Sequence, residues 1–214
     1  MARQRAVQQR AEDTQKAILE AALLAFSTDG YEGVSLRTLE TDAGVQRGRI
    51  AYHFENKETL WRRCVDLLVE RLDAHFAPLA ASFLDLDMAS RLRASVAAFV
   101  RYSAENPELG RIIAREGGQP SWRLTYLVEQ FQPRRNQWFE QVGGFELDPH
   151  LYYFIIGAGA FVFDVEFECR EIFGVDPRDD AFIRDHAAMI ADLLLAWVER
   201  RSGQENGRDP FLGR

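Results

Sequence analysis

The chain has 214 residues and a net charge of −7, with nearly half of its residues hydrophobic and just over a quarter charged. That composition is ordinary for a globular protein with a substantial core, and the negative charge argues against a general nucleic-acid coat or a membrane-surface protein. Residues 1–60 hold eight basic and nine acidic side chains, so bulk charge does not indicate DNA binding there either. A few well-placed cations would nevertheless suffice for a small docking surface.

The cysteines and the apolar segments favour a cytoplasmic protein. Cys64 and Cys169 stand far apart without CxxC spacing, which fits a reduced interior better than a disulfide framework or a zinc site. The first ten residues lack the apolar run of a secretory signal. The longest apolar stretch, residues 151–165, contains Gly157 and Gly159 and is too short for a bilayer span, so we expect no membrane association.

Helical periodicity runs through most of the chain. Apolar residues recur at helical spacing from about Asp13-Thr14 to Gly30. Short helices are predicted over residues 36–42, with Ser35 as N-cap, and over 47–53, and Asn56 is predicted to cap a linking helix over 57–76. Further helices are expected over residues 89–105, 107–116, 121–142, 150–173 and 179–201. No segment alternates as a strand would, so the sequence predicts an all-α fold of about nine helices.

The helices divide into a small and a large domain. We predict a flexible basic arm over residues 1–12 and a three-helix helix-turn-helix domain over 13–60. A larger helical domain is expected over 77–202, and a flexible tail over 203–214. The arm carries Arg3, Arg5 and Arg10, which fit both insertion into a DNA minor groove and a solvated tail.

Residues 36–53 have the pattern of a helix-turn-helix, in which one short helix braces a second that enters the DNA major groove. Gly44 can adopt the positive φ needed just past a helix end, and Val45 and Ile50 are predicted to face inward. The exposed side is predicted to present Gln46, Arg47, Arg49 and Tyr52. No acidic residue occurs between positions 43 and 54. Arginine can bind guanine and glutamine can bind adenine through paired hydrogen bonds, although two arginines alone would favour a solvated surface helix.

Two spaced runs carry a family resemblance. The first is Thr14-x3-Ile18-Leu19-x-Ala21-Ala22-x3-Phe26-x3-Gly30-Tyr31-x2-Val34-Ser35-Leu36. The second is Ala43-Gly44-Val45-x2-Gly48-x3-Tyr52-His53-Phe54-x-Asn56-Lys57-Glu58-x-Leu60. Over residues 14–61 the chain therefore resembles the N-terminal domain of the TetR/AcrR family of bacterial transcriptional regulators. The remainder fits the family only in the expectation of a divergent helical domain.

The resemblance implies a ligand-responsive regulator, with repression favoured, that binds a palindromic double-stranded DNA operator as a homodimer. A small-molecule effector bound in the C-terminal domain would release the DNA. No catalytic residue, metal or cofactor is implied. By position, the DNA contacts fall on Arg37, Gln46, Arg47, Arg49, Tyr52, His53 and Lys57. Two of these have structural alternatives, since Tyr52 can pack in the core and His53 can be a structural ring beside Phe54.

The sequence departs from the family pattern at two positions. Ala51 stands where an aromatic residue is usual, so one phosphate or thymine contact is expected to be missing. Glu40 occupies a position normally held by a small residue, four residues before the turn glycine. Because an unpaired buried carboxylate is costly, we expect Glu40 to reach the surface and pair with Arg37 or Arg49.

The C-terminal helices are expected to bind the effector and to form the dimer. A pocket with aromatic walls and a few polar groups suits a small molecule. The candidate ligand contacts are Phe99, Tyr102, Arg115, Glu116, Trp122, Arg123, Tyr126 and Phe131. In the family the last two helices usually pair with those of the partner. The candidate interface residues are Gly157, Phe161, Ile190, Leu194 and Trp197.

Three other functions fit parts of the sequence. An activator, or a regulator controlled by a protein partner, would have the same DNA-binding domain. A helical enzyme is a more distant alternative, because Asp164, Glu168 and Glu171 would share one face of the helix predicted over 150–173, near Cys169. No histidine stands at ligand spacing beside them, so an acidic stripe in solvent or at an interface is favoured.

Overall fold

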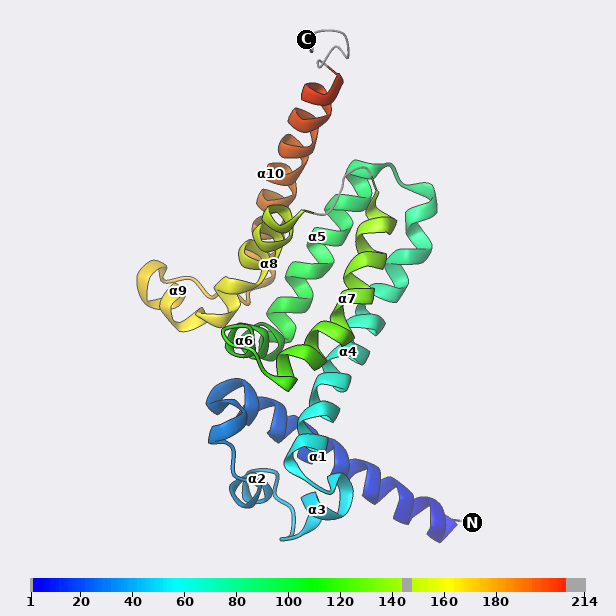
Figure 1. Ribbon diagram of the computed structural model, residues 1–214, viewed down its shortest axis with the longest axis vertical. Helices are drawn as coiled ribbons and strands as arrows, with labels where there is room; N and C mark the ends of the chain where they lie inside the picture. Colours follow the sequence, from blue (N-terminus) through cyan, green and yellow to red (C-terminus); the bar gives the residue numbers. More distant parts are fainter. Residues whose placement is uncertain (1, 144–147, 207–214) are drawn as a thin grey trace. The chain divides into compact units, whose positions relative to one another are not determined.

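The computed structural model describes residues 2–143 and 148–206. Within them the chain forms ten α-helices and one short 3-10 helix and no strand, which confirms the all-α class (Figure 1). The chain packs as two compact units. The first comprises residues 1–72 and 108–133, and the second comprises residues 73–107 and 134–214. This grouping differs from a single boundary near residue 77, because Ile112 and Leu127 are buried in the core of the first unit.

The first unit is built on α1 (Ala2–Gly33), α2 (Leu36–Asp42), α3 (Arg49–Phe54) and the first part of α4 (Lys57–Ser82). Most of α6 (Pro107–Glu116) and the start of α7 (Trp122–Val142) belong to it as well. One apolar face of each helix meets a common core. Its most buried members are Ile18, Ala22, Phe26, Leu39, Ile50, Phe54, Leu60, Trp61, Cys64 and Leu68.

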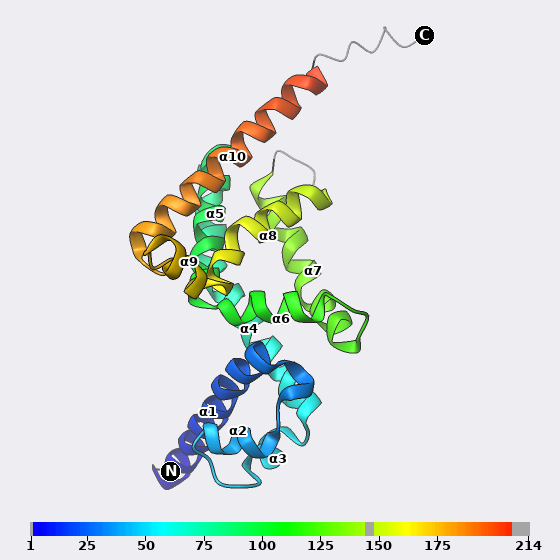
Figure 2. The same ribbon diagram turned by 90° about the vertical axis from the view of Figure 1, so that its left-hand side faces the viewer.

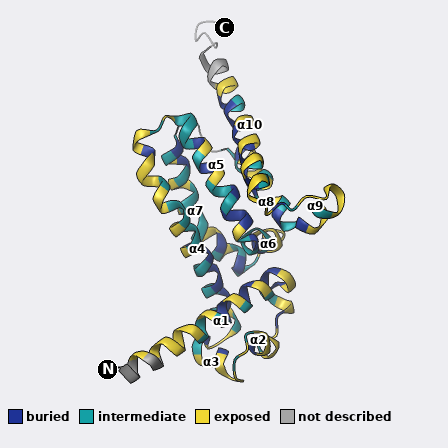
Figure 3. Ribbon diagram, turned by 180° about the vertical axis from the view of Figure 1, so that it is seen from behind, coloured by how far each residue is buried: buried dark blue, intermediate teal, exposed yellow. Residues whose placement is uncertain are grey.

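Residues 2–12 are helical and continue into the rest of α1, where the sequence predicted a flexible arm. No glycine or proline interrupts this stretch, and Thr14 lies inside the helix, donating its hydroxyl to the carbonyl of Arg10 at 2.7 Å. Residues 8–13 are exposed, whereas the second half of the helix is buried on one side (Figure 3). The backbone leaves the helical region at Gly30, with φ 74°, and a last turn continues to Gly33.

Two helix boundaries around α3 follow local signals. Asn56 caps α4 as predicted, accepting a hydrogen bond from the Thr59 amide at 2.9 Å. Helix α4 continues through Pro78 to Ser82, several residues beyond the predicted end. Helix α3 begins at Arg49, two residues later than expected, because Gly48 adopts φ 85° and remains in the turn.

The second unit has its own core around α5 (Met88–Glu105), which lies alongside α8 (Pro149–Asp164) and α10 (Asp180–Asn206) (Figure 2). The 3-10 helix Phe83–Asp85 and the end of α7 complete it. Gly159 permits a close approach to α5, since a Cβ there would lie 2.6 Å from Cε1 of Phe99. The N-cap Asp87 accepts a hydrogen bond from the Ser90 amide, and this bond lowers the pKa of its carboxyl group. The predicted tail falls partly in α10, and residues 207–214 lie outside the described residues.

The predicted helix over 150–173 is in fact two helices. Helix α8 ends at Asp164, and α9 (Glu166–Phe173) follows after a bend of 74° at Val165. The buried Glu166 carboxylate pairs with Arg178 at 2.6 Å and with Arg170 at 3.4 Å, which ties α9 to the segment that follows it. Within the described residues, no single helix is long and apolar enough to cross a membrane. In the same residues, only α8 and α9, taken together across their bend, have the length and composition for it.

Candidate DNA-binding surface

The turn between α2 and α3 depends on two glycines. Gly44 follows the end of α2 with φ 65°, as the sequence predicted, and its amide bonds to the carbonyl of Thr41 at 3.0 Å. Gly48 has φ 85° and precedes the first residue of α3. Residues with a Cβ rarely adopt such backbone angles. The two glycines therefore let the backbone turn sharply at residues 44 and 48, so that α3 packs against α2.

The two faces of α3 have opposite character. Ile50 and Phe54 are each 1% exposed and hold the helix on the core of the first unit. Tyr52 is 75% exposed, which is incompatible with the alternative that it packs in the core. Gln46, Arg47 and Arg49 are also exposed. The predicted inward and outward residues of this segment are thus found where they were expected.

The remaining candidate contacts lie on neighbouring elements. Arg37 is exposed on α2, and His53 is half-buried with its ring centroid 5.0 Å from that of Tyr52. Lys57, in the first turn of α4, already has intramolecular partners. Its Nζ donates to the carbonyl of Glu32 at 3.5 Å and lies 4.6 Å from the centre of the Tyr31 ring. This contact fixes where the ammonium group stands.

Glu40 does not reach the surface, and the predicted ion pair with Arg37 or Arg49 was wrong. The residue is 8% exposed, and its carboxylate points into the turn. Oε1 accepts hydrogen bonds from the amides of Gly48 at 2.7 Å and Ile50 at 3.2 Å. The amides at the start of α3 therefore satisfy the carboxylate, which removes the reason for expecting it to move outward.

The eight candidate ligand residues are divided between the two units. Phe99 and the buried Tyr102 belong to the second unit, whereas the other six belong to the first. Of these six, Glu116 and Arg123 form an ion pair with an Nε–Oε2 distance of 2.7 Å, and both are buried. The pair joins α6 to α7 and occupies two of the polar groups that the sequence offered to an effector.

Aromatic rings and cations surround this pair. The Arg123 guanidinium lies 4.7 Å from the centre of the Tyr31 ring, and the Trp122 ring packs edge-on against Trp61 at 5.2 Å. Tyr126 donates its hydroxyl to Asp66 of α4 at 2.5 Å. Burial, together with this hydrogen bond, raises the pKa of Tyr126 to about 12. These contacts fasten α6 and the start of α7 to the other helices of the first unit.

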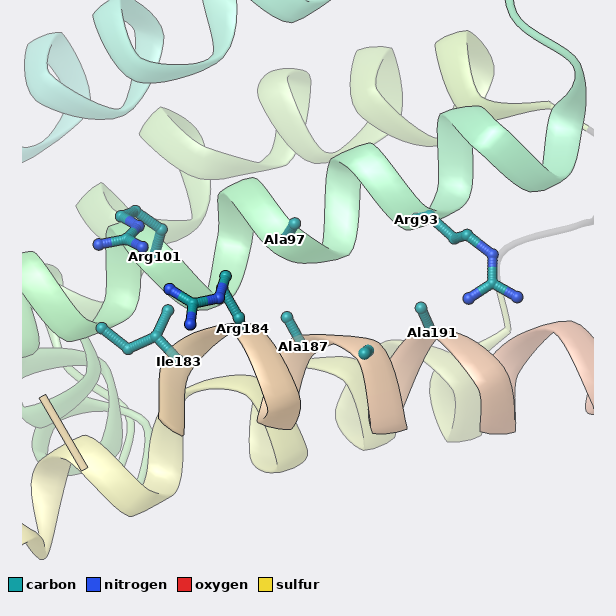
Figure 4. Close-up of a pocket in the computed structure, with 8 residues that line it drawn as sticks. Arg93, Ala97, Arg101, Ile183, Arg184, Ala187 and Ala191 are labelled. Atoms are coloured by element: carbon teal, nitrogen blue, oxygen red, sulfur yellow. The ribbon is translucent and has the colours of Figure 1, made fainter. Parts of the chain in front are cut away.

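A surface pocket of about 260 Å³ lies between α5 and α10 (Figure 4). Small apolar and arginine side chains line it: Arg93, Ala97, Arg101, Ile183, Arg184, Ala187, Ala188 and Ala191. Arg93 pairs with Asp192 and Arg101 pairs with Asp180, each at 2.6 Å. None of the candidate ligand residues belongs to this pocket, and the scattered positions of its arginines gave no signal in the sequence.

Only part of the predicted dimer interface is accessible. Gly157 and Phe161 are exposed on α8, and Trp197 is half-buried. Ile190 and Leu194 are 1% and 2% exposed because they point into the core of their own protomer. The large apolar side chains that are exposed on α8 and α10 are instead Tyr153, Phe154, Phe161, Met189 and Leu193.

The acidic residues suggested for a metal site do not share a helix face, because the bend at Val165 separates Asp164 from Glu168 and Glu171. Across the part of the chain that the structure describes, no group of three or more His, Cys, Asp or Glu side chains is placed to hold a metal ion.

A glycine turn between two short helices, with an apolar inner face and an exposed face of arginine and glutamine, is the arrangement of a DNA-binding helix-turn-helix. Residues 18–64 match the family described as bacterial regulatory proteins, tetR family. Over 195 residues the chain is 25% identical to the HTH-type transcriptional regulator RutR of Escherichia coli K12, covering 87% of this chain and 91% of RutR. The N-terminal helix-turn-helix therefore matches the tetR family, and over most of its length the chain is similar to a transcriptional regulator.

Two further similarities concern one segment of the sequence and the fold. A segment of 44 residues is 48% identical to the HTH-type transcriptional repressor AcnR of Corynebacterium diphtheriae, covering 21% of this chain and 23% of AcnR. The fold is similar to that of the transcriptional regulator FadR from Bacillus subtilis, solved in complex with stearoyl-CoA. Its TM-score is 0.60 at 17% identity, with 84% of this chain and 96% of FadR covered.

Proposed function

We propose that this regulator is a repressor that binds a palindromic operator as a homodimer and leaves it when a small molecule binds. The exposed cluster of Gln46, Arg47 and Arg49 on the turn and on α3 carries the proposal. These side chains have the donors and acceptors that read guanine and adenine in the major groove, and no carboxylate between positions 43 and 54 opposes them.

Phosphate contacts would surround this reading cluster. Tyr52 and Arg37 offer exposed donors, and His53 stands beside Tyr52. Lys57 is held by the Glu32 carbonyl and the Tyr31 ring, so its ammonium group would meet a phosphate with little loss of side-chain entropy. These contacts would set the register on DNA, and the reading cluster would supply the sequence preference.

The dimer would form through the exposed apolar face of α8 and α10. Two copies of a reading helix are needed to contact half-sites about one DNA turn apart. Replacement of Phe161 or Leu193 by glutamate is expected to give a monomer in sedimentation equilibrium, because a charge would have to be buried in the interface. Leu84→Glu is the control, since Leu84 is 87% exposed outside this face and its replacement should leave the dimer intact. A Phe161→Glu protein that stays dimeric would exclude this face.

The effector part of the proposal is supported by the family and by the FadR structure with stearoyl-CoA. The ligand contacts named from the sequence stay a prediction, with Glu116 and Arg123 already committed to each other. A compound that binds should raise the melting temperature and release operator DNA at the same concentration. Binding without release would contradict effector control, and regulation by a protein partner would then be favoured.

Selection of bound fragments from random duplexes tests the DNA-binding proposal directly. We expect one enriched palindrome, bound by two protomers. Recovery of no preferred sequence would overturn the proposal. The position of the operator relative to its promoter then separates repression from activation, because a site overlapping the promoter blocks transcription and an upstream site permits activation.

A further inference from the structure

Glu40 closes the turn between α2 and α3 through both its backbone and its side chain. Its carbonyl oxygen accepts a hydrogen bond from the Val45 amide at 3.0 Å, and its Oε1 accepts from the amides of Gly48 and Ile50. Because the carboxyl group is almost fully withdrawn from water, a movement of α3 that broke these bonds would leave a buried polar group without partners.

Helix α3 has no side-chain cap of its own. Its N-cap is Gly48, which has no side chain to accept a hydrogen bond from the first amides of the helix. Glu40 supplies that oxygen from α2, eight residues earlier in the chain. The start of the reading helix is therefore tied to α2 by a carboxylate, and Arg47 and Arg49 stand immediately on either side of the tied glycine.

We propose that Glu40 is a positioning residue for operator recognition, which fixes the start of α3 and so the directions in which Arg47 and Arg49 leave the backbone. The proposal rests on the proposed DNA-binding function and adds a residue that touches no DNA. Its effect falls on specificity. Hydrogen bonds to base edges require a narrow range of distances and angles, whereas attraction to phosphates is electrostatic and independent of sequence.

Three variants at position 40 separate the effects of side-chain length, charge and hydrogen bonding. Glu40→Gln keeps an acceptor oxygen at the same reach and loses the charge. Glu40→Asp keeps the charge and draws the oxygens back by one methylene group, and Glu40→Ala removes the acceptor. Asp42→Asn is the charge control, because it removes a carboxylate from the exposed side of the same helix.

The measurement is the ratio of affinity for the operator selected with the wild-type protein to affinity for a scrambled duplex of the same length at the same salt concentration. Glu40→Asp and Glu40→Ala are expected to lower this ratio about tenfold or more, comparable with the loss of one base contact. Glu40→Gln is expected to stay within about threefold of wild type, since a neutral acceptor still satisfies both amides. Asp42→Asn should leave the ratio unchanged. Amide exchange at Gly48 and Ile50 should quicken in the Asp and Ala variants only.

Each alternative result has a defined meaning. Folded Asp and Ala variants that keep the wild-type ratio would overturn the proposal. A Gln variant as impaired as the Asp variant would assign the effect to charge and overturn it as well. If neither Glu40→Asp nor Glu40→Ala folds, Glu40 has a purely structural role, and the proposal is overturned. If the wild-type protein selects no operator, the proposed function itself fails, which is a separate outcome.

Discussion

Replacing Glu116 with alanine removes the main partner of a buried guanidinium. Glu116 is 4% exposed and Arg123 is 8% exposed, and 2.7 Å separates Nε from Oε2. Removing one member of a buried ion pair costs about 3–5 kcal/mol, because the remaining charge stays out of water. Glu32, at 3.4 Å from Arg123, and the Tyr31 ring offset part of this cost. We therefore expect the free energy of unfolding to fall by about 3 kcal/mol.

Urea denaturation at a fixed protein concentration measures this fall. Glu129→Ala is the control, because it removes an exposed carboxylate from α7 and should change stability by less than about 0.5 kcal/mol. The double variant Glu116→Ala with Arg123→Met should be more stable than Glu116→Ala alone, since no unpaired charge is left. A loss below about 1 kcal/mol for Glu116→Ala, in the range of an exposed pair, would refute this account of the cluster.

Three further predictions concern stability. Gly48→Ala should lower the free energy of unfolding by about 1–2 kcal/mol, because Gly48 has a φ of 85°. Gly118 has no positive φ, so Gly118→Ala should not lower it, and equal effects would contradict the strain argument. Glu55 adopts φ 60°, so Glu55→Gly should raise stability by roughly 1 kcal/mol in thermal unfolding, and a loss would show that the angle is not strained. The pKa of Tyr126 is about 12 in the folded protein and 10 as the ordinary value, so the unfolded chain loses this proton first. Wild-type stability should therefore fall as pH rises from about 10 to about 12, and Tyr126→Phe should abolish that component. An unchanged pH dependence in Tyr126→Phe would show that burial and the Asp66 hydrogen bond do not raise the pKa of Tyr126.

The helix-turn-helix could be predicted well because its signals are local. Residues 36–42 form α2 as expected from Ser35 and Gly44, although the Ser35 side chain makes no capping bond. The positive φ of Gly44, the burial of Ile50 and the cap at Asn56 also depend on residues close in sequence. The same reasoning located α5, α6 and α7 to within a residue at each end.

The features that failed depend on where distant groups meet. The carboxylate of Glu40 finds its partners only because two glycines turn the chain back onto α2, and the sequence does not reveal that distance. Helix periodicity continues across Val165, so the sequence gives no local signal for the bend, and the partner of the buried Glu166, Arg178, lies outside the helix. On α10, the most regular apolar stripe, which includes Ile190, packs on the protomer's own core, and among the described residues the exposed side carries only Met189 and Leu193 as large apolar residues.

Base preferences of the wild-type protein and Arg49→Ala, measured on every single-base variant of the selected operator, test the central claim most directly. Arg49 is exposed at the start of α3, where its guanidinium can bind a base edge. We predict that the variant loses its preference at one position of each half-site, at a cost of about 1–3 kcal/mol, and keeps the others. Uniform weakening across all sequences, with every preference intact, would contradict the claim that this cluster reads the operator.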